Sequence, residues 1–244
     1  MNLEVLYTIL FSLLMLVFGY LIGSIPTSII IGRLHGIDIR QHGSHNAGGT
    51  NVGRVIGKKA GILTIVLDIL KCFLPCLVVF LIFNFVPVPF LSGYEHLKEL
   101  FVGLTATGVC LGHTFPLYAG FRGGKCVACF AGYIIFVSPI CFVLACALFF
   151  LLFFLFKKVS LSSVIAVPSA LLLLLVPMIL DLTVLPETTA FNGGTYFAPS
   201  CLLHLSYVTV VFAFLLASLV IVRHLGNIKR LEKGLEPETH FKKD

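Results

Sequence analysis

A polar stretch, QHGSHNAGGTNVGR at residues 41–54, lies between two of the most apolar segments of the chain. Its glycines allow a close backbone approach to a ligand, and successive exposed N–H groups can surround an anion. The candidate ligand-binding residues of this stretch are Ser44, Asn46, Thr50, Asn51 and Arg54. Their amides, hydroxyls and planar guanidinium suit a phosphate group. The stretch is not a Walker A loop, because Thr50 and Asn51 follow Gly49 where that loop has Lys and Ser or Thr. On glycine content alone, a flexible membrane turn is an equal alternative.

A second polar stretch, GHTFPLYAGFRGGKCVA at residues 112–128, ends in a glycine pair followed by a lysine. Gly123, Gly124 and Lys125 stand where a helix is expected to begin, so backbone N–H groups and a positive charge could meet an anion there. Lys125 could instead extend toward lipid headgroups.

Two further stretches carry hydroxyls and a histidine. KKVSLSS at 157–163 offers Ser160 and Ser163, which could bind a ligand or merely cap the next helix. RHLGNIKRLEKGLEPET at 223–239 places His224 and Asn227 three residues apart, so they share a face if a helix continues there. The basic residues of this last stretch are also what the cytoplasmic flank of a membrane span carries.

Membrane helices must position these stretches. The chain of 244 residues is 58% hydrophobic and only 11% charged, and its mean hydropathy of +1.05 lies far outside the range of soluble domains. The first apolar run is expected to be a retained span, because no basic residue precedes it and no Ala-x-Ala-like site follows it. The net charge of +6 reflects basic residues between spans, and no nucleic-acid binding is expected.

Six apolar runs are long enough to span a bilayer. They are residues 4–31, 60–83, 99–117, 126–156, 163–180 and 202–222. As one helix, the fourth run would be ~46 Å long, which exceeds the ~30 Å hydrocarbon core. It contains Ser138-Pro139 near its middle, which predicts a turn between two short helices.

The distribution of basic residues supports this hairpin. With the hairpin and an external N-terminus, only Lys98 of the 17 Lys and Arg lies outside, and Lys71 lies within a span. We therefore expect an all-α integral membrane protein of seven helices, with its N-terminus outside and its C-terminus cytoplasmic. Residues 1–244 form one domain in this prediction. Its cytoplasmic motif loops are 32–59, 118–125, 157–163 and 223–244, and its external loop is 181–200.

Ionisable residues and cysteines inside the spans have simple structural explanations. Asp68 and Lys71 lie three residues apart in the second span and are expected to pair, either as a structural ion pair or in shaping a site. The eight cysteines lie mostly in apolar runs, so we expect no disulfide framework. Cys126 and Cys129 lack the further ligands of a zinc site, and we expect no metal and no cofactor.

The predicted topology gathers the four polar stretches on one membrane face. They would form a cation-rich cleft with few carboxylates, which suits a phosphorylated substrate. A transporter or exchanger of a phosphorylated anion is the alternative, because it would share the basic cleft and a first helix broken at Pro26. Against that alternative, the sequence has no inverted repeat and no polar path to the outer face. A noncatalytic scaffold would tolerate replacement of Arg54 and Lys125.

In combination, these motifs resemble the bacterial membrane family of acyl-phosphate-dependent glycerol-3-phosphate acyltransferases. The similar segments are GSIP at 23–26, residues 36–71, GHTFPLYAGFRGGKCVA, SLSS and RHLGNIKRLEKG, in the family's order. The resemblance implies a seven-helix protein of the bacterial cytoplasmic (inner) membrane, with its active site on the cytoplasmic face. It implies transfer of a fatty acyl group from acyl phosphate to glycerol 3-phosphate, which gives 1-acylglycerol 3-phosphate (lysophosphatidate) and phosphate in phospholipid biosynthesis.

The resemblance also implies roles for individual residues. Catalytic roles are implied for Lys125, His224 and Asn227, and substrate binding for Ser44, Asn46, Gly48, Thr50, Asn51, Arg54 and either Ser160 or Ser163. Three positions depart from the family pattern. His45 replaces a glycine and is expected to crowd its loop or demand a left-handed backbone, while Cys126 and Cys129 replace a glycine and a threonine beside Lys125.

The mechanism expected from the residues is direct attack without an acyl-enzyme. No histidine has an acid five positions later, and too few acids lie on the inner face for a Ser-His-acid set. The hydroxyl of glycerol 3-phosphate would attack the mixed anhydride, with its proton passing to His224 or to the donor's own phosphate. Lys125, Arg54 and the hydroxyls would hold the acceptor's phosphate, and the glycine-rich loop would hold the leaving phosphate.

Overall fold

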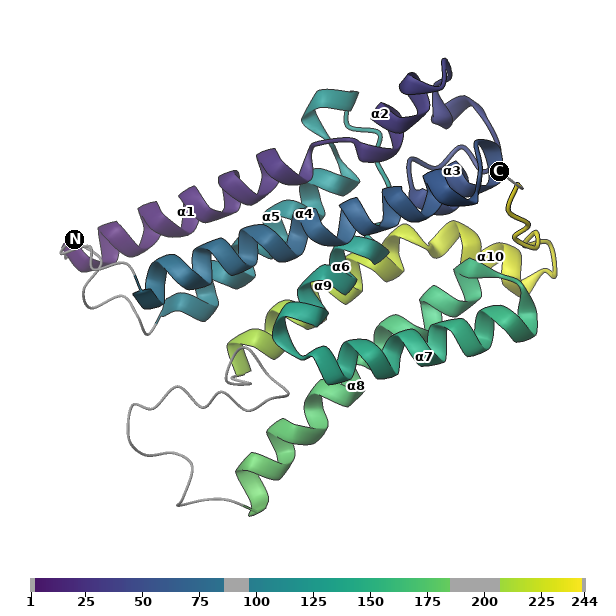
Figure 1. Ribbon diagram of the computed structural model, residues 1–244. Coiled ribbons are helices and arrows are strands. Elements are labelled where there is room, and N and C mark those ends of the chain that lie inside the picture. The colour runs from purple at the N-terminus through teal and green to yellow at the C-terminus, as the bar shows by residue number, and fades with distance from the viewer. Residues whose placement is uncertain (1–2, 86–96, 185–206, 243–244) are drawn as a thin grey trace.

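The computed structural model describes residues 3–85, 97–184 and 207–242, and these form an elongated bundle of helices (Figure 1). The helices, in chain order, are α1 (Leu3–Gly23), α2 (Thr27–Leu34), α3 (Gly49–Val55), α4 (Lys58–Phe85), α5 (Lys98–Thr114), α6 (Val127–Val137), α7 (Pro139–Phe156), α8 (Val159–Val184), α9 (Tyr207–Arg223) and α10 (Leu225–Glu232). Two 3₁₀ turns, η1 (Ile39–Gln41) and η3 (Leu117–Ala119), lie in the connecting segments. The described residues contain no strand, which confirms the predicted all-α class.

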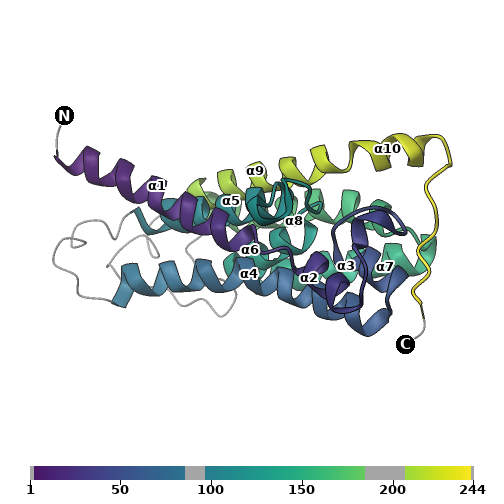
Figure 2. The ribbon, with the colours of Figure 1, turned by 90° about the horizontal axis from the view of Figure 1, so that it is seen from above.

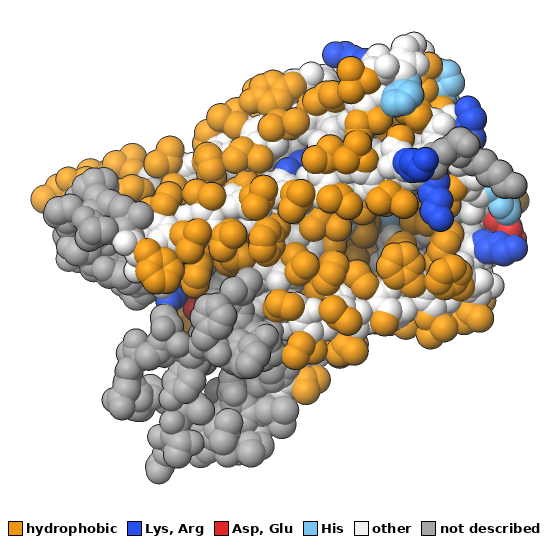
Figure 3. Space-filling model, viewed as in Figure 1, with side chains coloured by type: hydrophobic (Ala, Val, Ile, Leu, Met, Phe, Trp, Pro, Cys, Tyr) orange, Lys and Arg blue, Asp and Glu red, His pale blue; other side chains and the backbone are white. Residues whose placement is uncertain are grey.

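Within the described part of the chain, five helical segments are long and apolar enough to cross a membrane, or up to six if α9 and α10 form one bent span. Hydrophobic side chains cover the flank of the bundle, and most of the visible Lys, Arg and His side chains gather at the end that carries α2, α3 and α10 (Figure 3). This distribution fits an integral membrane protein. The count of seven spans and the orientation of the termini stay predictions.

The predicted hairpin within residues 126–156 is confirmed. Helix α6 ends at Val137 and α7 begins at Pro139, and the Ser138 hydroxyl accepts a hydrogen bond from the Cys141 N–H at 3.4 Å. Proline at the first position of α7 costs no hydrogen bond, because that N–H has no partner within a helix. The sequence Ser138-Pro139 thus ends one helix and begins the next.

The predicted boundary of the next span is wrong by one turn. Helix α8 extends from Val159 to Val184, so residues 181–184 of the predicted external loop are helical. An apolar stretch continues through Leu182 and Val184, and nothing in it breaks a helix before Pro186. The remainder of the predicted loop lies outside the described residues.

Glycines permit the close approach of α1 and α5. Gly19 and Gly23 of α1 are four residues apart, as are Gly108 and Gly112 of α5. A methyl group added at any of the four would overlap the backbone of the facing helix. Small residues at this spacing are a common means of packing membrane helices, because they let the two backbones touch. Most of α1 faces outward, so this contact fixes its position.

A buried polar cluster stabilises the break between α1 and α2. The Thr27 hydroxyl donates to the Asp68 carboxylate at 2.5 Å, and Lys71 Nζ donates to the Ile25 carbonyl at 3.1 Å. Asp68 and Lys71 form the predicted ion pair at 2.8 Å, with both side chains buried. His113 Nδ1 of α5 lies 3.6 Å from the same carboxylate. The cluster supplies partners for backbone groups that the broken helix leaves free.

Candidate active site

Residues distant in sequence meet at the polar end of the bundle. Lys125 Nζ donates to Asn227 Oδ1 at 2.5 Å, and these residues are 102 positions apart. Asn227 Nδ2 donates to Glu236 Oε1 at 2.7 Å, and Arg230 Nε donates to Glu236 Oε2 at 2.7 Å. The Asn227 amide therefore orients the Lys125 ammonium while the carboxylate of Glu236 orients the amide.

The backbone before Lys125 is anchored to the end of α5. The N–H of Gly124 donates to the His113 carbonyl at 3.0 Å, and the N–H of Gly123 donates to the Thr114 carbonyl at 3.2 Å. A side chain at Gly124 would overlap the His113 ring, and one at Gly123 would overlap the His113 carbonyl. Only glycine allows the segment to lie this close to α5, which explains the glycine pair before Lys125.

Lys125 has an unusual environment for a lysine. Its burial, together with the nearby charges of Arg230, Arg223 and Arg54, lowers its pKa to about 8, against the opposing effect of Glu236. The ammonium is still mainly charged at neutral pH. A partly desolvated cation attracts a phosphate more strongly than an exposed one.

His224 joins α9 to α10 and is neutral. Its ring Nδ1 lies 2.8 Å from the Val220 carbonyl, and a carbonyl can only accept a hydrogen bond, so Nδ1 carries the proton. Burial is the main cause that lowers its pKa to about 4. The lone pair is therefore on Nε2, which makes this nitrogen a possible proton acceptor.

The C-terminal segment, residues 235–242, brings Arg54 to the same end of the bundle. The Arg54 guanidinium donates to the Thr239 hydroxyl at 2.6 Å, and the Thr239 N–H donates to the Lys157 carbonyl at 2.7 Å. The Lys242 N–H donates to the Gly53 carbonyl at 3.1 Å. The segment runs from α10 across the end of the molecule to α3 (Figure 2). Burial lowers the pKa of Arg54 from its usual value.

Glu236 is a buried carboxylate that the sequence analysis did not single out. Burial alone would raise its pKa, but the neighbouring Ser160, Asn227 and Arg230 side chains together hold the pKa below its usual value. The available signal was an acid nine residues after Asn227 in an otherwise basic segment. Such a segment is typical of a solvated flank, so the sequence did not predict a buried role for Glu236.

The structure distinguishes the two candidate serines. Ser163 donates its hydroxyl to the Val159 carbonyl of its own helix at 2.8 Å. The Ser160 hydroxyl is close enough to Glu236 to affect its pKa, but it forms no hydrogen bond of normal geometry within the described chain. Ser160 therefore belongs to the cluster around Lys125, and Ser163 is bonded within α8.

Asn51 organises the first motif loop from inside. Its Nδ2 donates to the Ile39 carbonyl at 3.0 Å and to the His42 carbonyl at 2.9 Å, and its Oδ1 accepts from the Ser44 N–H at 2.8 Å. The side chain is buried, and both of its polar atoms are bonded to the backbone of the loop. Asn51 thus gives the loop its shape.

The other residues predicted in this loop are more open. Ser44 is exposed, and Asn46, Gly48 and Thr50 are half-buried. In the described structure, none of their side chains forms a hydrogen bond with Lys125, His224 or Asn227. The loop nevertheless contacts the second motif, because a side chain at Gly124 would lie 2.8 Å from the Ala47 carbonyl.

The departures from the family pattern have a clear backbone consequence. His45 has φ 57° and Cys126 has φ 68°, so both adopt the left-handed conformation that favours glycine. The expectation of a left-handed backbone at His45 is confirmed, and its exposed ring does not crowd the loop. Cys126 and Cys129 are buried free thiols. Among the described residues, no three His, Cys, Asp or Glu side chains are grouped in a way that could hold a metal ion.

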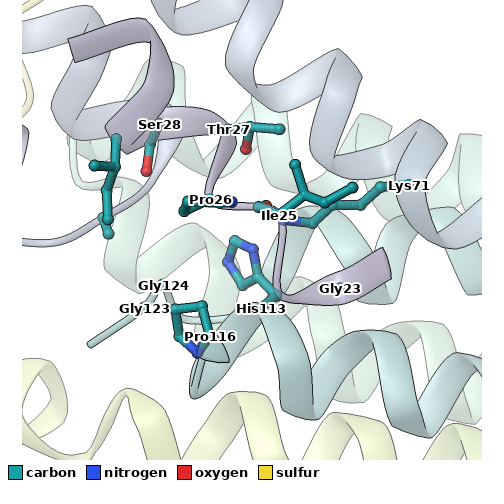
Figure 4. Close-up of a pocket in the computed structure, with 12 residues that line it drawn as sticks. Gly23, Ile25, Pro26, Thr27, Ser28, Lys71, His113, Pro116, Gly123 and Gly124 are labelled. Atoms are coloured by element: carbon teal, nitrogen blue, oxygen red, sulfur yellow. The ribbon is translucent and has the colours of Figure 1, made fainter. Parts of the chain in front are cut away.

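A small pocket lies where the break of the first span meets the glycine pair. Residues 23 and 25–29 form one wall, and Lys71, His113, Gly123 and Gly124 form much of the rest (Figure 4). Ala47 of the first loop also lines it. The pocket shows that the broken span, the first loop and the glycine pair pack as one unit.

Residues 13–234 match the sequence model of a family described as glycerol-3-phosphate acyltransferase. A relative of that name from Enterococcus faecalis is 38% identical over 229 residues, which are 93% of this chain and 92% of the relative. Another, from Chlorobaculum parvum, is 38% identical over 91% of this chain and 94% of its own length.

Two solved structures are similar along nearly the whole chain. Both are crystal structures of PlsY (YgiH), described as an integral membrane glycerol 3-phosphate acyltransferase, and both are 30% identical to this chain. The glycerol 3-phosphate form has a TM-score of 0.73 and covers 94% of this chain and 96% of its own. The lysophosphatidic acid form has a TM-score of 0.71 and covers 93% and 94%.

Proposed function

Because this chain belongs to the glycerol-3-phosphate acyltransferase family, we propose that the cluster of Lys125, Asn227, His224, Arg54 and Ser160 is its active site. The chain is an integral membrane acyltransferase, and the comparisons support this function and not the transporter. The observation that carries the site is the contact of Lys125 with Asn227, which joins two motif loops beside a neutral histidine.

The acceptor is glycerol 3-phosphate in this proposal. The similar crystal structures are of a glycerol 3-phosphate form and a lysophosphatidic acid form, and these molecules are an acceptor and its acylated product. Lys125, Arg54 and Ser160 bind the phosphate of glycerol 3-phosphate. Asn227 holds the Lys125 ammonium in place, and Glu236 holds Asn227.

The donor is an acyl phosphate, whose acyl carbon is already activated by a phosphate leaving group. The acceptor's hydroxyl oxygen bonds to the acyl carbon, and the bond from that carbon to the phosphate oxygen breaks. The phosphate departs with the electron pair. No covalent bond to the enzyme is needed, so the protein contributes positioning and charge stabilisation.

The hydroxyl proton passes to His224 Nε2 or directly to the departing phosphate. The neutral state of His224 and the proton on its Nδ1 leave Nε2 able to accept it. The first motif loop, shaped by Asn51, binds the leaving phosphate through Ser44, Asn46, Gly48 and Thr50. The site faces the cytoplasm, because its four loops carry most of the basic residues of the chain.

An assay with the purified protein tests this function. Synthetic palmitoyl phosphate should release phosphate only when glycerol 3-phosphate is present, with 1-acylglycerol 3-phosphate as the second product. Lys125→Ala and Asn227→Ala should each lower kcat/KM by about 100-fold or more, which corresponds to about 2.7 kcal/mol of transition-state stabilisation.

Lys229→Ala is the matched control, because this lysine is exposed on the same short helix as Asn227. It should leave kcat/KM within about twofold of the unsubstituted protein. Near-normal turnover by either Lys125→Ala or Asn227→Ala would remove these residues from the active site. Acyl-CoA and acyl carrier protein donors in the same assay identify the true donor class.

A further inference from the structure

Four side-chain atoms in the described part of the chain are buried without a hydrogen-bond partner. They are Arg54 Nε, Thr114 Oγ1, Ser160 Oγ and Arg223 Nε. Buried polar atoms are normally bonded, so a group of unbonded ones at a single end of a protein indicates a ligand that supplies the missing partners. Arg54 and Ser160 belong to the proposed acceptor site. Thr114 and Arg223 have no role in it.

Arg223 lies over the side chain of Phe115, the residue that follows Thr114 at the end of α5. Thr114 is its last residue and is fully buried, and its carbonyl accepts the Gly123 N–H. Arg223 is the last residue of α9, and its guanidinium carbon lies 5.5 Å from the centre of the Phe115 ring. This cation–π contact holds the guanidinium beside Phe115 without a hydrogen bond to the ring.

The charges around the site leave a cation that could bind a second anion. Glu236 pairs with Arg230, whereas Lys125, Arg54 and Arg223 have no carboxylate partner among the described residues. The charge of Arg223 also lowers the pKa of both Lys125 and His224, so it lies near each of them. The proposed reaction brings together two phosphate groups, each carrying a charge of about −2. Lys125 and Arg54 match the first group, and Arg223 is the cation left for the second.

The surroundings of Arg223 indicate which of the two phosphate groups, that of the donor or that of the acceptor, would lie beside it. The residue before Arg223 and several residues of the segment that follows α5 are apolar and exposed. They are Val222, Phe115, Leu117, Tyr118 and Phe121. In a membrane protein such a surface lies against lipid chains. A donor whose acyl chain lies in the bilayer reaches the site from this side. Arg54, in contrast, is hydrogen-bonded to Thr239 and is therefore next to the C-terminal segment rather than to these apolar side chains.

We propose that Arg223 and Thr114 form the binding subsite for the phosphate group of the acyl phosphate donor, beside the Gly123 backbone. This subsite rests on the proposed function and adds two residues to it. The guanidinium donates to the phosphate oxygens from the stack on Phe115. The Thr114 hydroxyl donates from the last residue of α5. As the acyl carbon is attacked, these groups stabilise the departing phosphate together with the first motif loop, whose Ala47 carbonyl lies beside Gly124.

Initial rates measured against each substrate separately test the subsite. Arg223→Gln should raise the KM for palmitoyl phosphate by about tenfold or more and leave the KM for glycerol 3-phosphate within about twofold. Inorganic phosphate, as a competitor of palmitoyl phosphate, should inhibit this variant less. Arg122→Gln is the matched control, because Arg122 is exposed in the loop after α5, and it should change neither constant.

Thr114→Val separates binding from folding. Removal of an unbonded buried hydroxyl should not lower the thermal unfolding temperature. The same change should raise the KM for palmitoyl phosphate by about fivefold. If Arg223→Gln does not fold, Arg223→Lys and Thr114→Val decide the question.

Two outcomes overturn the subsite. One is a rise in the KM for glycerol 3-phosphate alone, which would move Arg223 to the acceptor. The other is kinetics of Arg223→Gln and Thr114→Val that match Arg122→Gln. Failure of the proposed function is a different result, because the unsubstituted protein would then show no turnover of palmitoyl phosphate that depends on glycerol 3-phosphate.

Discussion

At the scale of single residues, the proposed role of Lys125 predicts that activity depends on pH. Its pKa is lowered to about 8, and a lysine is charged below its pKa and neutral above it. We therefore expect kcat/KM for glycerol 3-phosphate to be constant around neutral pH and to fall about tenfold per pH unit above about 8. Rates measured from pH 6.5 to 10 give this profile.

Lys125→Arg is the control for the pH profile, because arginine stays charged throughout this range. The variant should be slower, since its fork does not reproduce the lysine contact with Asn227, but its fall above pH 8 should disappear. His224 should add no limb between pH 6.5 and 7.5, because its pKa is about 4. A fall at pH 8 that persists in Lys125→Arg would assign it to another group.

His45 offers a separate test on stability. A left-handed backbone costs a non-glycine residue about 1–2 kcal/mol of strain. Glycine removes this strain, but it also makes the unfolded chain more flexible, which offsets part of the gain in folding stability. His45→Gly should therefore raise stability by about 0.5–1 kcal/mol, seen as a higher thermal unfolding temperature. Cys126→Gly should change it less, because Cys126 is buried and its packing would be lost. A lower unfolding temperature for His45→Gly contradicts this account.

At the scale of elements, the contact of α1 with α5 depends on glycine. The Cβ atom of Gly108→Val would overlap the Leu16 carbonyl and the Tyr20 amide of α1. The helices must then separate, and such overpacking costs about 1–3 kcal/mol. The thermal unfolding temperature should fall. Gly226→Ala is the control, because a methyl group there would meet only Arg230 Nη1, at an ordinary contact distance of 3.8 Å, so alanine should be neutral or stabilising.

The elements divide into those that the sequence could and could not predict. The hairpin at Ser138-Pro139 and the pair of Asp68 with Lys71 follow from local rules on proline and on helical spacing, and the structure has both. The short α3 and the 3₁₀ turn at 39–41 lie in a segment predicted only as a loop. Their stability comes from the buried Ile39 and Val52 side chains rather than from helix propensity.

The proposed site was predictable to a similar degree. Resemblance to a family supplied Lys125, His224 and Asn227, and the structure brings them to one end of the bundle. The inward role of Asn51 and the choice of Ser160 over Ser163 depend on which way each side chain points. The contact of Glu236 with Asn227 depends on the path of the C-terminal segment. Residue spacing carries no information on these tertiary contacts.

At the scale of the whole molecule, the proposed orientation can be tested by labelling. Lys229 is exposed at the polar end, so Lys229→Cys should react with a membrane-impermeant maleimide in inverted vesicles and not in intact cells. A Cys201→Ser background removes the cysteine that the prediction places near the outside. Of the seven other cysteines, six are buried and Cys146 is partly buried, so their labelling should be slow. Labelling of Lys229→Cys in intact cells would reverse the topology.

The C-terminal segment, residues 235–242, also sets the order of events in biosynthesis. The ribosome makes it after every predicted span, yet it supplies Glu236 to Asn227 and Thr239 to Arg54. All predicted spans can therefore enter the bilayer before the proposed phosphate-binding groups are aligned. In the proposed site, a nascent chain would lack these contacts, and catalytic competence would arise only when the C-terminal segment packs against α3.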